Sequence, residues 1–360
     1  MSQPGPGSEN VPFPAAPLGD LGGQAETEKR RSAGYRRLNL VLAMGVIATI
    51  AFVFRTLAPS STAGIEGAAR DFFTLAISVI IESLPFVFLG ILVSILVQVW
   101  LPPDFMFRWL PSNPVLRRMV LSLLGMLMPV CECGNVPTTR GLMLKGLAVG
   151  ESMTFLFAAP ILNPVTIITT QQAFGWDSGI LAWRIAGGFM IANLVGSIYS
   201  RNREPSRLLT PRFEAACNTE AHHHAAHGKM RQSVELFQHE ANAMMPALFI
   251  GAGLAGLIQV GVPRNVLVAL GSDPLWSVLA LMVLAFVVSI CSTVDAFFIL
   301  SFGATFLPGS IVAFLVFGPM IDVKMLALLR TTFTSRTLVH LTALIALCAL
   351  VLGWGVNLAS

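Results

Sequence analysis

The sequence predicts an all-α, polytopic membrane protein, and three observations carry this prediction. Of the 360 residues, 54% are hydrophobic and only 12% are charged, whereas soluble domains carry about a quarter charged residues. The mean hydropathy is +0.73. The apolar residues also gather in runs of the length that a helix needs to cross a bilayer, about 20 residues. A water-soluble protein is therefore excluded, and the lipid bilayer is the expected surrounding.

Seven apolar runs are long enough to be transmembrane helices, and they cover residues 38–57, 72–101, 150–172, 180–199, 238–260, 309–329 and 337–358. Two further stretches, 115–149 and 275–307, begin apolar and are interrupted at 129–137 and 291–295. Proline removes a backbone donor and glycine permits unusual φ, so each stretch is expected to be a broken, re-entrant hairpin. The prediction is about eight spans plus two hairpins. The alternative counts each hairpin arm as a full span, which gives ten or eleven.

The ends and the middle of the chain differ from these runs. Residues 1–37 are a polar tail that is expected to be disordered, and 38–57 is expected to be a retained first transmembrane helix. The charged segment 201–235 is expected to be an exposed cytoplasmic linker between two repeats, 70–200 and 236–358. Its four histidines, a cluster that could bind a metal or be simply solvated, are His222, His223, His224 and His227.

The two halves share landmarks at one offset, near 160 residues. The aligned pairs are Pro85 with Pro246, Gly90 with Gly251, Gly150 with Gly309, Pro160 with Pro319, and Asn163 with Asp322. One such match is common by chance in apolar sequence, but this ordered set predicts a duplication.

Charge then predicts how the two repeats are oriented. Basic residues gather at 29–31, at 201–231 and from Lys324 to Arg336. If all three lie in the cytoplasm, the N-terminus is cytoplasmic and each half has three crossings and one hairpin. Because each half then crosses the membrane an odd number of times, the second half has the opposite orientation in the membrane to the first. Inverted repeats with broken helices near the midplane are an architecture of secondary transporters.

Cys131 and Cys133 flank Glu132 in the first interruption. At a helix break, for which Gly134 and Pro137 are suited, both thiols could face one pocket. Thiolates are soft ligands for thiophilic centres. The alternative is that both are small buried hydrophobic residues. Cys217 and Cys348 are expected to carry no function.

Glu132 and Asp295 are carboxylates within apolar surroundings. Ionisable groups at membrane depth are costly and usually functional, so both are candidates for carrying a proton during a transport cycle. The alternative is a structural acid paired with Arg140 or Lys145. Lys145 is expected to anchor the first hairpin at the lipid headgroups, and the role of Arg140 stays open.

Asn163 and Asp322 follow prolines inside apolar runs. Pro160, Pro164 and Pro319 leave backbone carbonyls without partners, and irregular backbone at depth is tolerated where it lines a cavity or is packed in protein. The symmetric placement favours a binding site. The alternative is that the two polar side chains only repair the helix kinks.

Several other classes of function are disfavoured. The net charge of +4 comes from residues between apolar runs, as in membrane anchors, so nucleic-acid binding is not indicated. His239 and Glu240 lack the second histidine of a zinc-protease helix, and no phosphate-binding loop of the Walker type is present. We therefore expect a protein that is not an enzyme, with no cofactor and no resident metal.

The segments PVCECGNVPTTRGLMLKG, FLFAAPILNPV and ICSTVDAFFILSFGATFLPGSIVAFLVFGPMIDVK resemble the ArsP/YraQ-type predicted permeases. The resemblance covers roughly residues 70–355. It implies a bacterial inner-membrane permease, and members with an assigned role are implicated in arsenical resistance through efflux of trivalent organoarsenicals such as methylarsenite.

The resemblance also implies where the motifs of the family fall on this sequence. They are Cys131, Cys133 and Gly134; Ala158 to Pro164; Cys291, Ser292 and Asp295; and Gly318 to Asp322. The expected substrate-binding residues are Cys131, Cys133, Asn163, Cys291 and Asp322, with Glu132 and Asp295 coupling transport to protons.

Three alternatives stay open at this point. The chain could be a permease for another metal, metalloid or small solute. It could be a membrane thiol oxidoreductase that uses Cys131 and Cys133 as a redox pair. It could also be a non-catalytic partner subunit that binds metal or protein through its histidine-rich linker. The oligomeric state is not predicted.

Overall fold

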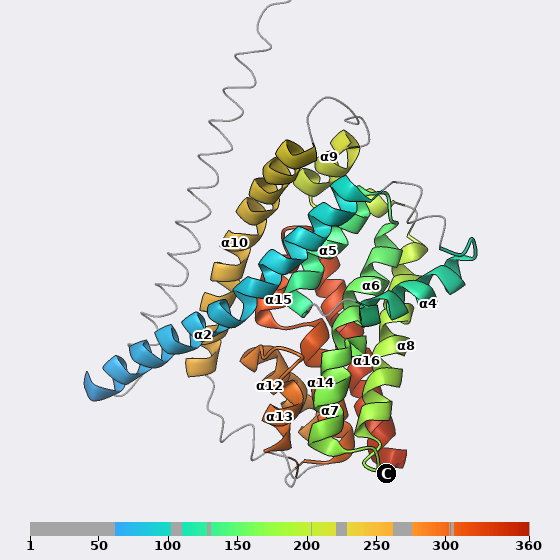
Figure 1. Ribbon diagram of the computed structural model, residues 1–360. Coiled ribbons are helices and arrows are strands. Elements are labelled where there is room, and N and C mark those ends of the chain that lie inside the picture. Colours follow the sequence, from blue (N-terminus) through green and yellow to red (C-terminus); the bar gives the residue numbers. More distant parts are fainter. Residues whose placement is uncertain are drawn as a thin grey trace, which may run out of the picture. The chain divides into compact units, whose positions relative to one another are not determined.

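The computed structural model describes residues 62–101, 110–127, 131–202, 204–220, 229–261, 276–301, 303 and 306–359. The expected tail at 1–37, the expected first helix at 38–57 and the four histidines of the linker lie outside these residues. Residues 66–360 form one compact unit, and the description below concerns that unit (Figure 1).

Regular structure in the described residues is helical, apart from one isolated antiparallel bridge between Leu209 and Phe333. The first half contains α2 (Thr62–Ile95), the π-helix η1 (Leu96–Trp100), α4 (Pro114–Leu124), the 3-10 turn η2 (Gly125–Leu127), α5 (Glu132–Leu144), α6 (Val149–Leu162), α7 (Pro164–Phe174) and α8 (Ile180–Ser200). The rest contains the 3-10 turn η3 (Pro205–Leu208), α9 (Pro211–Glu220), α10 (Lys229–Gly261), α12 (Trp276–Val288), α13 (Asp295–Leu300), α14 (Pro308–Met320), α15 (Val323–Leu329) and α16 (Ser335–Ala359).

Six stretches of the described helices are long and apolar enough to cross a membrane: Gly67–Trp100, Val149–Phe174, Ile180–Ser200, Lys229–Gly261, Pro308–Leu329 and Ser335–Ala359. Each coincides with a predicted apolar run, and the seventh run, 38–57, lies outside the described residues. The expected total is about eight spans, and the described residues contain six. Every residue of α6 is buried, as is α14 from Gly309 onward, because both helices are surrounded by other helices.

The linker is more ordered than the sequence suggested. Its described part forms η3 and α9, and Leu208, Leu209 and Phe213 are buried. Thr210 N donates a hydrogen bond to the Thr332 carbonyl at 2.8 Å, which fastens this segment to the turn before α16. The expectation of an exposed linker is therefore wrong for Leu208, Leu209 and Phe213, because their apolar side chains pack into the helix bundle.

Two stretches are broken, as predicted. One consists of α4, η2 and α5 and the other of α12 and α13, and no α-helix among them exceeds 13 residues. At 1.5 Å per residue, each is about 20 Å long or less, too short to cross a bilayer core of about 30 Å.

The first break lies earlier than the sequence suggested, because α5 already begins at Glu132 and contains both Gly134 and Pro137. Gly134 serves close packing instead of a turn. A Cβ atom on Gly90 of α2 would collide with the Gly134 carbonyl oxygen, so the two helices approach at their glycines.

The first hairpin enters and returns beside one end of α6. Arg117 near the start of α4 contacts Glu151 in the first turn of α6 at 3.3 Å. The end of this arm, at Gly125, packs against Ala159 deep along α6. The second arm, α5, then leads back to the start of α6 at Val149.

The second hairpin has the same relation to α14. Ser277 in the first turn of α12 lies 2.6 Å from Ser310 in the first turn of α14, measured between the two Oγ atoms. Further along, Ala285 packs against Gly318. The short helix α13 then returns toward the start of α14.

The helices α6 and α8, and likewise α14 and α16, touch through glycines. A Cβ on Gly196 of α8 would lie 2.8 Å from the Gly150 carbonyl oxygen, and a Cβ on Gly353 of α16 would lie 2.9 Å from the Gly309 carbonyl oxygen. Small residues at helix contacts allow backbones to approach closely within a membrane.

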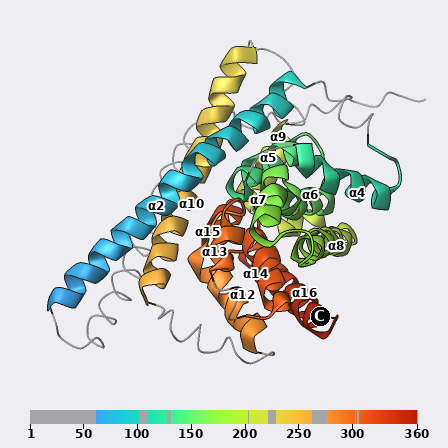
Figure 2. The same ribbon diagram turned by 60° about the horizontal axis from the view of Figure 1, so that its bottom comes forward.

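The helices α8 and α16 run in opposite directions. The bridge from Leu209 to Phe333 places the chain just after α8 beside the chain just before α16, and the two helices pack along each other. Figure 1 shows the C-terminal end of α16 at the end of the bundle opposite α9. In both Figure 1 and Figure 2, the long helices α2 and α10 cross each other on one side of the bundle. There α10 packs against α15, and α2 packs against α5 at Gly90 and Gly134.

Candidate functional site

The first helix break positions Cys131 and Glu132. Cys131 is the N-cap of α5 with extended backbone (φ −72°, ψ 174°), and its carbonyl accepts hydrogen bonds from the amides of Gly134 and Asn135 at 3.1 Å. Glu132 is therefore the first helical residue, where the helix dipole favours a negative charge. Cys131, Glu132 and Cys133 are all buried.

The second break positions Cys291 and Ser292. It begins at Ser289, whose φ of 52° lies in the left-handed region, a conformation that costs a non-glycine residue about 1–3 kcal/mol and clusters at functional sites. The Cys291 carbonyl accepts hydrogen bonds from the amides of Val294 and Asp295 and so starts α13.

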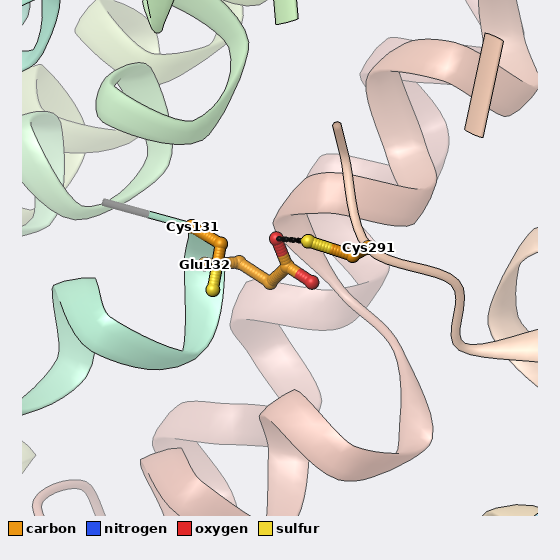
Figure 3. Close-up of side chains that lie close together, drawn as sticks. All are labelled: Cys131, Glu132 and Cys291. Carbon is orange, nitrogen blue, oxygen red and sulfur yellow. Dashed lines mark hydrogen bonds between the residues drawn. The ribbon is translucent and has the colours of Figure 1, made fainter. Parts of the chain in front are cut away.

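The two breaks meet at Glu132. One ligand atom from each of Cys131, Glu132 and Cys291 lies within 4.8 Å of the other two, and all three residues are buried. Figure 3 shows the Glu132 carboxylate reaching across to Cys291 from the other half. The Cys291 Sγ lies 3.7 Å from Glu132 Oε2, and Ser292 donates to the same oxygen from Oγ at 3.1 Å and from its amide at 3.4 Å.

Lys324 completes this cluster. Its Nζ lies 3.0 Å from Glu132 Oε1 and 3.8 Å from Asp322 Oδ2, and the residue is only 1% exposed. The expectation that Lys324 belongs to a basic aqueous loop is therefore wrong. It lies in the first turn of α15, where two buried carboxylates attract its charge. One ammonium facing two carboxylates leaves this cluster with one excess negative charge when all three are ionised.

Asp322 and Asn163 begin half-helices at equivalent places. Asp322 Oδ1 accepts a hydrogen bond from Met325 N at 2.6 Å and caps α15. Asn163 Oδ1 accepts one from Val165 N at 2.9 Å and caps α7. Both residues are buried. Each capping bond satisfies an orphan amide of its helix, which is the kink-repair role that the sequence left open. Asp322 also faces the cluster through Lys324.

The prolines and the glycine that were expected at kinks or hairpin turns all lie within the described helices. Pro164 is the first residue of α7, where its missing N–H costs nothing. Pro160 lies inside α6, Pro319 inside α14 and Pro137 inside α5.

Asp295 stands apart from the cysteine cluster. It forms a two-pronged pair with Arg184 of α8, at 3.0 Å and 2.6 Å, so its partner is neither Arg140 nor Lys145. Arg140 instead pairs with Glu240 of α10 at 2.9 Å and 3.3 Å. Lys145 is half-buried and reaches the Leu101 carbonyl at 3.4 Å.

Sequence reasoning missed Lys324, Arg184 and Ser292 as members of these networks. It also missed Glu82 on α2, which is close enough to Lys324 and Glu132 to interact with both electrostatically. Three of the four are ionisable residues inside apolar runs, a signal that by itself marks a functional position. Ser292 was marked only by the family element that it shares with Cys291 and Asp295.

The arrangement combines two buried thiols, a carboxylate and an ammonium at a meeting point of broken helices. Such a cluster could bind a small thiophilic solute, because thiolates select soft centres, and its carboxylate could take up a proton. A family model described as "Predicted permease" (ArsP_1) matches residues 68–358.

Curated proteins match as well. The UPF0718 protein YcgR of Bacillus subtilis is 34% identical over 267 residues, which is 73% of this chain and 89% of that protein. The "Putative two-component membrane permease complex subunit" of Streptococcus mutans is 32% identical over 264 residues, 72% of this chain and 86% of that protein. The UPF0718 protein YraQ of Escherichia coli is 25% identical over 113 residues, 31% of this chain and 32% of that protein.

No solved structure matches the chain significantly. The family model extends from the second turn of α2 to the last turn of α16, and it includes both helix breaks. The apolar helices and the relatives identify a multi-pass membrane protein, and the chain belongs to the ArsP_1 family of predicted permeases.

Proposed function

We propose that this protein is a secondary transporter of a bacterial inner membrane that moves a small thiophilic solute out of the cell. The observation that carries the proposal is the convergence of Cys131 and Glu132 from one half with Cys291 from the other, within 4.8 Å. A trivalent organoarsenical such as methylarsenite has this chemistry.

Capture would proceed by ligand exchange. Two thiols, Cys131 together with Cys133 or Cys291, replace two hydroxide ligands on arsenic. Two As–O bonds break and two As–S bonds form, and each hydroxide leaves as water with the proton of one thiol. Arsenic keeps its oxidation state, so the exchange needs no oxidant and reverses on release. Asn163 and Asp322, at the starts of α7 and α15, would line the polar side of the chamber.

Alternating access would come from two inverted repeats. The equivalent glycine contacts of α6 with α8 and of α14 with α16 support a duplication, and so do the equivalent hairpins beside α6 and α14. The opposite directions of α8 and α16 support the inversion. Rocking of one repeat against the other around a fixed site is the usual route in such folds. The N-terminus would then be cytoplasmic.

Protonation would couple to release through Glu132 and Asp295. Glu132 shares its carboxylate with Lys324, Ser292 and Cys291, so protonation of Glu132 weakens every contact that holds the cluster. Asp295 holds Arg184, so its protonation releases a link between α13 and α8. A proton gradient can drive both changes.

The test is transport of methylarsenite into everted membrane vesicles with and without a pH gradient. Replacing Cys131 and Cys133 together with serine should abolish uptake and resistance while the protein still reaches the membrane. Cys348→Ser is the matched control, because this thiol lies on α16 away from the cluster, and uptake should be unchanged. Wild-type uptake by the double variant would refute thiol capture.

The membrane thiol oxidoreductase is disfavoured by burial. Cys131 and Cys133 are 2% and 0% exposed, whereas disulfide exchange requires access of a partner thiol to the attacking sulfur. Trapping a mixed disulfide between Cys131 or Cys133 and a partner protein would revive that alternative.

The relative in S. mutans is named as a subunit of a two-component complex, and we infer that a second membrane subunit assembles with this chain. Co-purification from the native host tests that assembly.

A further inference from the structure

We propose that the same site also carries a thiophilic divalent cation of the Zn²⁺ or Cd²⁺ type. This inference rests on the proposed function and names a second class of substrate for the site. Its ligands are Cys131 Sγ, Cys291 Sγ and the Glu132 carboxylate. These ligand atoms already lie within 4.8 Å of one another. Bond lengths of about 2.3 Å to sulfur and about 2.1 Å to oxygen would bring them to roughly 3.5–4 Å apart, a shift within reach of side-chain rotation.

The carboxylate distinguishes this cargo from an arsenical. A trivalent organoarsenical is held by two As–S bonds and is uncharged after the exchange, so Glu132 is not one of its ligands. A dication bound by two thiolates gains a further anionic oxygen from the carboxylate. Sulfur together with carboxylate oxygen suits Zn²⁺ and its heavier relatives, whereas Mg²⁺ and Ca²⁺ require oxygen ligands throughout.

The surroundings hold the carboxylate in a ligating orientation. Lys324 contacts Oε1 at 3.0 Å, which leaves Oε2 directed at Cys291 with a separation of 3.7 Å. Ser292 donates to Oε2 from its hydroxyl at 3.1 Å and, over a longer distance, from its amide at 3.4 Å, so a metal at Oε2 would take the place of the Cys291 thiol hydrogen and lengthen the amide contact. Such outer partners fix the orientation of metal ligands. Binding of the cation would displace one proton from each of the two thiols, and both protons would leave to water.

Three protein ligands leave a fourth coordination position open. Structural zinc sites are closed by four protein ligands, whereas sites that exchange a bound group keep one position free. A transported cation must enter and leave, and an open position allows an incoming water or thiol to displace it. The buried thiols on two different halves would bind the cation when the halves are together and release it when they separate.

The experiment uses the purified full-length protein in detergent with Cd²⁺ as the probe. Formation of cadmium–thiolate bonds is followed by their ultraviolet charge-transfer absorption. The wild type should bind one equivalent, with excess Mg²⁺ failing to compete. Glu132→Gln and Cys291→Ser should each weaken Cd²⁺ binding by about tenfold or more, since loss of even an outer partner costs that much. Cys348→Ser should match the wild type.

A parallel titration with methylarsenite separates the two proposals. Methylarsenite binding without Cd²⁺ binding in the wild type would overturn the cation cargo and leave the proposed function standing. Binding of neither would overturn both. Unchanged Cd²⁺ affinity in Glu132→Gln would also overturn this site, and Cys291→Ser decides the matter if the first variant fails to fold.

Discussion

Two buried arginine–carboxylate pairs flank the cysteine site, and they differ in how firmly they are held. Arg140 on α5 pairs with Glu240 on α10, and Asp295 on α13 pairs with Arg184 on α8. Each pair therefore joins a hairpin arm of one half to a long helix of the other. They lie toward opposite ends of α8, whose 21 residues span about 30 Å.

The Arg140 pair has several additional supports. Its guanidinium donates to the Thr331 carbonyl at 3.2 Å and to Thr332 Oγ1 at 3.0 Å. Its Cζ also lies 4.2 Å from the centre of the Phe213 ring, a distance at which a cation is attracted to an aromatic face. The linker and the turn before α16 thus reinforce the contact between α5 and α10.

The Arg184 pair depends on one carboxylate. Besides Asp295, the described residues offer Arg184 only the Thr170 hydroxyl at 2.6 Å, and Nε has no hydrogen-bond partner among them. Neutralising Asp295 would therefore leave Arg184 with one hydrogen bond, whereas neutralising Glu240 would leave Arg140 with three of its contacts. We therefore expect the end of the bundle near α13 to open more readily, and we propose Asp295 as the group that receives a proton there.

The largest expected effect comes from neutralising each acid in turn. Asp295→Asn leaves Arg184 nearly without compensation and should lower the free energy of unfolding by about 3–5 kcal/mol. Glu240→Gln leaves Arg140 with its carbonyl, hydroxyl and ring, and the loss should be about 1–3 kcal/mol, as for a hydrogen bond to a charged group.

Denaturant unfolding in one detergent, followed by tryptophan fluorescence, measures both variants. The two replacements are matched, since each exchanges a carboxylate for an amide of the same shape. Equal losses would show that the extra partners of Arg140 contribute nothing, and the proposed difference between the two ends would be wrong.

Much of this arrangement could be predicted from local sequence. Runs of about 20 apolar residues define the spans, because each helix must satisfy its own backbone in lipid. The interruptions around Cys131 and Cys291 were visible because polar residues, proline and glycine broke otherwise apolar runs. The first break was placed too late, since Gly134 was taken as a turn residue when it serves a close contact with Gly90.

The partners of the charged residues could not be predicted. Lys324 approaches Glu132 from almost 200 positions further along the chain, and Arg184 meets Asp295 across more than 100. Patterns within a short stretch of sequence do not show which residues pair over such separations. Lys324 was also grouped with Arg330 and Arg336, since basic residues after an apolar run commonly lie in cytoplasmic loops. The buried acids facing it explain why it lies inside instead.

A smaller loss of unfolding free energy is expected when Phe213 loses its aromatic ring but keeps an apolar side chain. Phe213→Leu keeps most of the buried apolar area but removes the aromatic face beneath Arg140, so we expect a loss of about 0.5–2 kcal/mol. The measurement is a double-mutant cycle that combines Phe213→Leu with Glu240→Gln and, as the control, with Asp295→Asn. Coupling should appear only with Glu240. Equal coupling to both acids would indicate a general loosening of the fold instead of local support.

The smallest change in stability, and the sharpest functional one, is expected when the weaker pair is replaced as a whole. Arg184→Met together with Asp295→Leu removes both charges from the bundle, and exchange of a buried ion pair for apolar side chains is often neutral or stabilising. The unfolding free energy should therefore stay near that of the wild type, within about 1 kcal/mol, in contrast to Asp295→Asn alone. Transport driven by a pH gradient should nevertheless be lost, because no carboxylate remains to receive the proton between α13 and α8.

Methylarsenite uptake into everted vesicles at matched protein levels measures this loss. Retention of pH-driven uptake by this double variant would make the pair purely structural and would leave Glu132 as the proton-coupling residue.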